Sequence, residues 1–310
     1  AAYSLLWALG LSYGAWRIQD VNENDNLHNS HSFLNVIAIQ PNFSLQDLAS
    51  NPELAHSKRQ GNLKSLLEDS KKYLSKLSKQ NENPKLLVWP ESVFPHPFFK
   101  VKEARQKVIR FAKENNTSIL FTTVDWENTM TERKFHGVSV LVGSNGEILG
   151  RYNKIFLIPF GETIPFSKIF PQIAAWLRTN IANMSEFEPG QDYKVFPLSE
   201  KVRLSAPICF DVFSQKVVRG MSLNGANLVV NLSNLAWFGR STASDNMVSV
   251  LRWKAIENRV PVIFASNNGE SVFIGADGKN LTRQLGLFEE GALIAKLQLQ
   301  SRFSFFRQYE

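Results

Sequence analysis

The chain has 310 residues, of which 44% are hydrophobic and 20% are charged. This content of core-forming residues excludes a disordered chain, and the scarcity of long apolar runs excludes a bundle of membrane helices. The balance of 35 basic against 28 acidic residues gives a net charge of +7, and the single cysteine excludes an intramolecular disulfide and a cysteine-based zinc site. The length suits one large globular domain or two small ones.

The chain begins with an uncharged apolar run, residues 1–16, which Arg17 ends. This run is too short to cross a bilayer, and it lacks the basic start and the cleavage site of a signal peptide. We predict that residues 1–17 are the end of a truncated transmembrane helix; the alternative is an apolar core helix. Residues 18–33 are polar and rich in Asn, which is typical of a linker.

The predicted main domain covers residues 34–300 and begins with short apolar runs that alternate with amphipathic ones. The pattern predicts strands at 34–39, 85–89 and 118–124, and helices over about 57–79 and 101–115. Strands that are apolar throughout are typical of a sheet covered by helices, so the fold class is α/β. The basic residues of both helices lack interleaved aromatics. We therefore expect no nucleic-acid partner, and attraction to an anionic lipid surface is at least as well supported.

The second part of the domain contains further strands and helices between two hairpins. Asn145-Gly146 predicts the turn of the first hairpin and Asp277-Gly278 that of the second. Between them the sequence predicts strands at 203–208, 227–232 and 261–266, a helix from about Ser214 and another over about 244–258. Two α/β stretches, each followed by a hairpin, indicate two similar halves in one domain. Residues 301–310 are predicted to form a C-terminal tail.

Cys209 ends the apolar run RLSAPI and precedes a polar bend and a helix. A strand-to-helix turn of this kind presents a nucleophile, so we predict a partly exposed, activated thiol. A thiol needs a base to become a thiolate at neutral pH, and none of the five His residues lies at the end of a clear strand. A carboxylate is therefore the next candidate for the base. The alternative is an inert, buried Cys.

Glu91 and Lys154 are the charged residues whose positions suit such chemistry. Glu91 follows KLLVWP, where Pro90 ends a buried strand, so the acid projects from the edge of the sheet at which α/β sites form. Lys154 directly follows the first hairpin and would supply a fixed cation for a developing oxyanion. Taken alone, each residue is more often a solvated surface charge.

Glu91, Lys154 and Cys209 lie in three of five short motifs along the chain. In order, the motifs are WPES at 89–92, YNKIFLIPFGETIPF at 152–166, FEPG at 187–190, PICFD at 207–211 and SNLAWFG at 233–239. Together they resemble the nitrilase superfamily and, more narrowly, the extracytoplasmic domain of the apolipoprotein N-acyltransferase family. The resemblance runs from about Leu34 to the second hairpin. The segment around Lys154 and the AWFG segment separate this branch from ordinary amidases.

The resemblance implies a four-layer α-β-β-α sandwich of the nitrilase type, with a catalytic triad of Glu91, Lys154 and Cys209. The chemistry of the residues agrees, because a buried carboxylate can take the thiol proton, and Lys154 with the backbone N–H of Phe210 can stabilise a tetrahedral oxyanion. Supporting positions are matched by Glu162, Asp211, Asn234 and Trp237. The resemblance implies no cofactor and no metal.

The implied reaction is a ping-pong acyl transfer. The thiolate attacks an acyl ester of a membrane phospholipid and forms a thioester, and the α-amino group of a diacylglyceryl-modified apolipoprotein then takes the acyl chain. These partners place the catalytic domain on the periplasmic face of a bacterial inner membrane. Two alternatives stay open: a soluble nitrilase-type amidase that uses water as the second nucleophile, and a catalytically decayed lipoprotein-binding paralogue.

The sequence departs from the family around the nucleophile. The family usually has Tyr-Glu where this chain has Phe210-Asp211, and Asp where it has Leu235. The nucleophile set is intact and its surround is altered, which affects substrate identity and rate more than reaction class. Three further departures are His136-Gly137 in place of Tyr-Asn, Ser244-Asp245-Asn246 in place of a His-bearing segment, and the absence of a Trp after the first strand.

Two aromatic-rich apolar stretches, 155–160 and 166–177, lie close to Lys154 in the sequence. An enzyme that takes an acyl chain from a bilayer needs apolar surface at the mouth of its cleft. We predict that Phe166, Phe170 and Trp176 border the opening to Cys209. Ordinary core packing is the alternative.

Overall fold

The computed structural model describes residues 2–27, 32–44, 52–77, 85–94, 96–129, 133–165, 167, 169–170, 172–174, 176, 186–299 and 304–309. The chain divides into two compact units, residues 1–32 and 33–310. The first unit contains the helix α1 (Ala2–Leu27), which continues through most of the stretch predicted as a linker. Among the described residues, no helix combines the length and the apolar character needed to cross a membrane.

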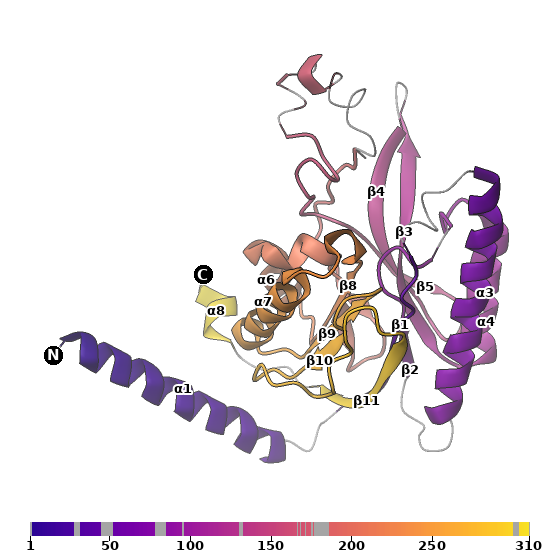
Figure 1. The fold of residues 1–310 in the computed structure, drawn as a ribbon. Helices are drawn as coiled ribbons and strands as arrows, with labels where there is room; N and C mark the ends of the chain where they lie inside the picture. Colours follow the sequence, from indigo (N-terminus) through magenta and orange to yellow (C-terminus); the bar gives the residue numbers. More distant parts are fainter. Residues whose placement is uncertain are drawn as a thin grey trace. The chain divides into compact units, whose positions relative to one another are not determined.

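The second unit contains two sheets with helices beside them (Figure 1). The first sheet has the strand order β11-β1-β2-β3-β4-β5. Its strands are β1 (Ser32–Gln40), β2 (Lys85–Val88), β3 (Ser118–Asn128), β4 (Arg133–Val142), β5 (Ile148–Asn153) and β11 (Gly291–Leu299). The strands β1 to β3 pair in parallel, whereas β3 to β5 pair antiparallel. Gly146, at φ +82°, forms the predicted turn between β4 and β5.

The second sheet has the strand order β10-β9-β8-β7-β6. Its strands are β6 (Phe196–Pro197), β7 (Arg203–Ser205), β8 (Leu228–Ser233), β9 (Val262–Ser266) and β10 (Val272–Ile274). The three central strands β7, β8 and β9 pair in parallel. Because parallel strands end at the same edge of a sheet, Cys209 after β7 and Asn234 after β8 are brought to one edge.

Side-chain alternation along β1 shows how the layers pack. Val36 and Ala38 belong to the core that includes the second sheet, whereas Ile37 and Ile39 belong to a core formed with helices. The helices α3 (Pro52–Leu77) and α4 (Lys102–Glu114) cover the first sheet, and α6 (Gln215–Leu223) and α7 (Ala243–Asn258) cover the second (Figure 1). The predicted four-layer α-β-β-α sandwich is confirmed.

Three parts of the chain differ from the sequence prediction. The strand β11 was not predicted, and it extends the first sheet beyond β1. The second hairpin keeps its turn at Gly278, but its returning limb is not a strand. It joins β10 through a bridge between Ile274 and Asn280 and a hydrogen bond from the Leu281 N–H to the Phe273 carbonyl oxygen (2.7 Å). The predicted tail contains the short helix α8 (Phe305–Tyr309), which contacts α6 and α7. These are tertiary contacts that a local apolar pattern does not encode.

Candidate active site

Cys209 begins the 3₁₀ turn η1 (Cys209–Phe213) that follows β7. Its backbone has φ +48°, a left-handed conformation that is uncommon for a residue with a side chain. Asn231 of β8 holds the turn, because its Nδ2 donates hydrogen bonds to the carbonyl oxygens of Pro207 (3.2 Å) and Cys209 (3.1 Å). Cys209 is only 3% exposed, so the prediction of a partly exposed thiol is wrong. The turn packs against β8 and α6 and belongs to the apolar core.

Glu91 lies directly beyond β2, after Trp89 and Pro90, in the position that the sequence predicts. Its Oε2 accepts a hydrogen bond from the backbone N–H of Asn234 (2.9 Å), and its carboxyl group lies close enough to the Cys209 thiol for each group to shift the pKa of the other. Burial raises the pKa of Glu91 to about 7, and the nearby Lys154 charge offsets this rise only in part. Glu91 is therefore a proton acceptor matched to neutral pH.

Lys154 follows β5 directly, and its backbone N–H donates to the carbonyl oxygen of Gly137 (2.9 Å). Its side chain is 1% exposed; Nζ donates to Glu162 Oε1 (2.6 Å) and lies 4.0 Å from Glu91 Oε1. The other oxygen of Glu162 accepts from the N–H of Ile158 (2.9 Å). Burial by itself lowers the pKa of Lys154, but Glu91, Cys209 and Glu162 together raise it above its usual range. Lys154 is thus a permanent cation in the site.

The charges of the cluster determine how the thiol ionises. Burial raises the pKa of Cys209 above its usual range, Glu91 raises it further, and Lys154 lowers it only in part. The resting thiol is therefore protonated. A thiolate added to Glu91 and Glu162 would leave three anions facing one cation. Transfer of the thiol proton to Glu91 avoids this, because the net charge of the buried group does not change.

The other predicted positions are distributed around this cluster. The ring of Phe210 stacks on Phe213 (4.9 Å between centroids) and on Phe238 (5.8 Å). Asn234 is buried; its Oδ1 accepts from the N–H of Ala236 (3.2 Å), and its Nδ2 has no hydrogen-bond partner within the described part of the chain. Trp237 lies on the turn η2 (Ala236–Phe238) and is 72% exposed.

Three polar residues of this region, Tyr152, Asn231 and Ser233, were not among the predicted site residues. Ser233 lies close enough to Cys209 to lower the pKa of the thiol in part, and its Oγ donates to Asn231 Oδ1 (2.9 Å). Tyr152 donates its hydroxyl proton to Asp211 Oδ2 (2.7 Å), and both residues are buried. The sequence did contain a signal for two of them, since Asn231 and Ser233 are polar residues within an apolar strand. A buried polar group needs a hydrogen-bond partner, so such residues mark a buried polar network.

Histidine was the first type of base considered for the Cys209 thiol. His28 and His31 lie outside the described residues, and His136 is buried with its Nδ1 2.9 Å from the carbonyl oxygen of Glu188.

Phe170 is 54% and Trp176 is 61% exposed, which excludes core packing for these two. Phe166 lies outside the described residues, and the position of this aromatic surface beside Cys209 stays a prediction.

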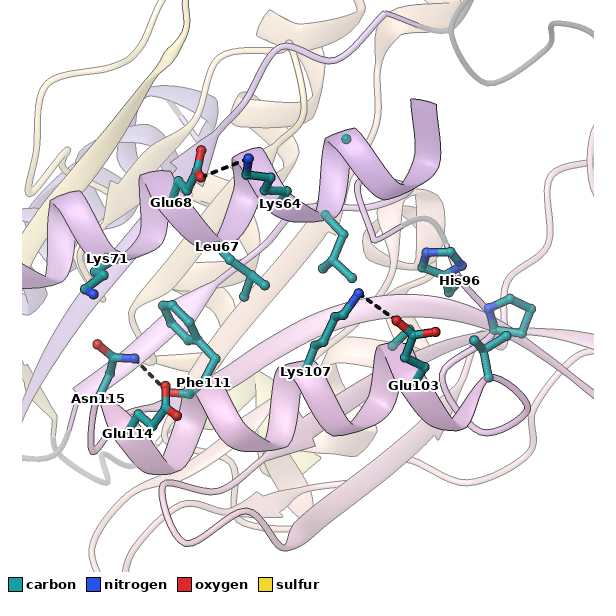
Figure 2. A pocket seen from close by; sticks show the side chains of 15 residues that line it. Lys64, Leu67, Glu68, Lys71, His96, Glu103, Lys107, Phe111, Glu114 and Asn115 are labelled. Atoms are coloured by element: carbon teal, nitrogen blue, oxygen red, sulfur yellow. Dashed lines mark hydrogen bonds and ion pairs between the residues drawn. The ribbon is translucent and has the colours of Figure 1, made fainter. Parts of the chain in front are cut away.

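A cavity of about 930 Å³ lies elsewhere, between α3 and α4 (Figure 2). We call it the α3–α4 groove. Leu67 and Phe111 supply apolar side chains to it, while Lys64, Glu68, Glu103 and Lys107 form ion pairs within each helix along its sides (Figure 2). None of the predicted catalytic or supporting residues lines this groove. The sequence therefore directs attention to the buried cluster, although the groove is large.

The four-layer sandwich defines a nitrilase-type protein, and the solved amidase from Nesterenkonia sp. has the same fold: TM-score 0.60 at 21% identity, with 92% of this chain and 95% of that chain covered. Residues 50–304 match the family model for the carbon-nitrogen hydrolases, so the chain belongs to the carbon-nitrogen hydrolase family.

Two similar curated proteins are both named apolipoprotein N-acyltransferase. The apolipoprotein N-acyltransferase of Geobacter metallireducens is 31% identical over 224 residues, which cover 72% of this chain and 42% of the relative. That of Borreliella burgdorferi is 26% identical over 310 residues, which cover 97% of this chain and 55% of the relative. The chain thus spans about half the length of these relatives.

Proposed function

We propose that this protein is an N-acyltransferase that moves an acyl chain from a membrane phospholipid to the amino group of a diacylglyceryl-modified apolipoprotein. The observation that carries the proposal is the cluster in which Glu91, whose pKa is raised to about 7, lies 4.0 Å from Lys154 and beside Cys209. The similarity to apolipoprotein N-acyltransferases supplies the substrate class. We further propose that the domain acts at the periplasmic face of a bacterial inner membrane, where both substrates reside.

In the first half-reaction, the Cys209 sulfur attacks the ester carbonyl of the phospholipid while its proton passes to Glu91. The oxyanion of the tetrahedral intermediate is stabilised by Lys154 and by the N–H of Phe210. The intermediate collapses with cleavage of the ester C–O bond, and Glu91 returns the proton to the departing lysophospholipid oxygen. Cys209 then carries the acyl chain as a thioester.

In the second half-reaction, the apolipoprotein amine attacks the thioester carbonyl and gives a proton to Glu91. The C–S bond breaks, an amide forms, and the proton returns to the Cys209 sulfur. Exclusion of water from this step distinguishes acyl transfer from hydrolysis. The low exposure of Cys209 supports that distinction.

The experiment is mass spectrometry of Cys209 after incubation with phospholipid vesicles, followed by addition of a diacylglyceryl-cysteine peptide. We expect an acyl adduct on Cys209 that the peptide removes with formation of an N-acyl peptide. Cys209→Ala is the control and should give neither product.

Two results would overturn the proposal. An adduct that forms only from short amides, with release of ammonia, identifies a soluble nitrilase-type amidase. Binding of the peptide without an adduct from either donor identifies a decayed lipoprotein-binding paralogue.

A further inference from the structure

The Asp211 carboxylate joins the nucleophile turn to the segment that carries Lys154. Asp211 Oδ2 accepts hydrogen bonds from the Tyr152 hydroxyl (2.7 Å) and from the backbone N–H of Ile208 (2.9 Å). Asp211 Oδ1 accepts from the backbone N–H groups of Phe156 (2.7 Å) and Ile155 (3.2 Å). One side chain thus binds four donors that come from two different parts of the chain.

The donors lie on either side of the two catalytic candidates. Ile208 directly precedes Cys209, so its bond to Asp211 closes the turn in which Cys209 adopts φ +48°. Tyr152 precedes Lys154 by two residues, and Ile155 directly follows it. The relative placement of the sulfur and the ammonium group therefore depends on these four bonds.

Asp211 is not a second candidate for the general base. An ionised carboxylate offers about four acceptor positions, and the four donors fill them. Asp211 is completely buried and Tyr152 is 1% exposed, so water does not readily replace a lost bond. The proton that leaves the thiol consequently goes to Glu91.

We infer that Tyr152 and Asp211 are positioning residues: their hydrogen bonds fix the Cys209 turn against the Lys154 segment, so that the ammonium group meets the oxyanion. This inference rests on the proposed function, because it assigns Cys209 as the nucleophile. It adds Tyr152, which belongs to no part of the catalytic triad, and it gives Asp211 a role distinct from proton transfer.

The test uses an activated ester, p-nitrophenyl butyrate, whose acyl group reports the acylation of Cys209 without a membrane. The rate constant and the KM of the nitrophenolate burst are measured for the full chain and for Tyr152→Phe, Asp211→Asn and Asp211→Glu. Ser70→Ala is the matched control: Ser70 is a buried residue of α3 whose hydroxyl bonds Leu66 O and the Trp89 indole, outside the Asp211 network. Thermal unfolding of each variant is recorded alongside.

We expect Tyr152→Phe to lower the burst rate constant about tenfold, because one of four bonds is lost. Asp211→Asn replaces an acceptor by a donor and displaces the turn, so a loss of about a hundredfold is expected. KM should stay within about twofold in both variants, since neither residue contacts the acyl chain. Asp211→Glu, which restores the carboxylate, should recover part of the rate, and Ser70→Ala should retain the rate of the unmodified chain.

The outcomes distinguish a failure of the proposed nucleophile from a failure of the positioning role alone. If the unmodified chain gives no burst, the proposed nucleophile is wrong and the positioning role falls with it. If the unmodified chain gives a burst and Tyr152→Phe matches it, the positioning role alone is overturned. If Asp211→Asn does not fold, the burst rate constants of Tyr152→Phe and Asp211→Glu still test the positioning role. A purely structural role lowers the unfolding temperature of these variants without lowering the rate constant.

Discussion

Two lysine–glutamate pairs of this protein, Lys154–Glu162 and Lys64–Glu68, differ in how far water reaches them. In the buried cluster, Lys154 and Glu162 are 2.6 Å apart with side chains 1% and 19% exposed. On the outer helices beside the α3–α4 groove, Lys64 and Glu68 are 3.9 Å apart with side chains 77% and 68% exposed. Water screens the second pair but not the first. Desolvation, more than residue type, therefore sets the two pairs apart and favours the first as a candidate site.

Replacement of Lys154 by Met should give the largest effect, because it leaves the partly buried carboxylates of Glu91 and Glu162 without their cation. We expect the acylation rate to fall at least about a hundredfold, in line with loss of an oxyanion partner. The free energy of unfolding should fall by roughly 3 kcal/mol, as for other broken buried pairs. Burst kinetics and urea unfolding measure the two effects. Wild-type behaviour in both would mean that the buried pair is no different from the exposed ones.

Glu91→Gln should lower the acylation rate by about two to four orders of magnitude, since the thiol loses its proton acceptor. In the unmodified chain the rate should rise with pH around a midpoint of about 7, because only the carboxylate form of Glu91 accepts the proton. The variant should lack this midpoint. A pH–rate profile of both proteins checks the assignment, and an unchanged midpoint in Glu91→Gln would assign the titration to another group.

The same shift has a consequence for stability. The pKa of Glu91 is raised from 4.5 to about 7 on folding, so its contribution to stability is fully present below pH 4.5 and is lost as the pH rises to about 7. Glu91→Gln should reduce this pH dependence. Urea unfolding between pH 4 and 8 measures it.

The exposed aromatic side chains provide a smaller effect that concerns the membrane. Phe170→Ser and Trp176→Ser should each weaken binding to phospholipid vesicles about five- to tenfold, because each removes apolar surface that would enter the lipid interface. Their unfolding temperatures should change little, since both residues are exposed. Trp253→Ser is the control, because Trp253 is 62% exposed on α7 and lies outside this segment. Equal losses for all three variants would argue against a specific lipid-binding segment.

The smallest effect is expected at the α3–α4 groove. Lys64→Ala and Lys107→Ala remove partners of exposed ion pairs within a helix, so each should change the free energy of unfolding by less than about 0.5 kcal/mol. The acylation rate should not change. A rate loss comparable to that of Lys154→Met would show that the groove takes part in the reaction.

Patterns within short stretches of the sequence are sufficient to predict the local elements and to select the candidates for the reactive residues. Apolar periodicity was sufficient for most strands and for α3, α4, α6 and α7, and Asn145-Gly146 was sufficient for a hairpin turn. The sequence also selected Glu91, Lys154 and Cys209, because each directly follows a strand or hairpin. These patterns depend only on residues close together in the sequence, so they can be recognised without knowledge of the fold.

Long-range packing sets which distant segments meet and how deeply they are buried. The place of β11 beside β1 and the hydrogen bonds that Tyr152, Ile155 and Phe156 donate to Asp211 join residues far apart in the chain. The low exposure of Cys209 is likewise a property of the packed turn, and it reverses the expectation of a readily ionised thiol. A pKa depends on the water and the charges that surround a group after folding, and these surroundings are set by long-range packing.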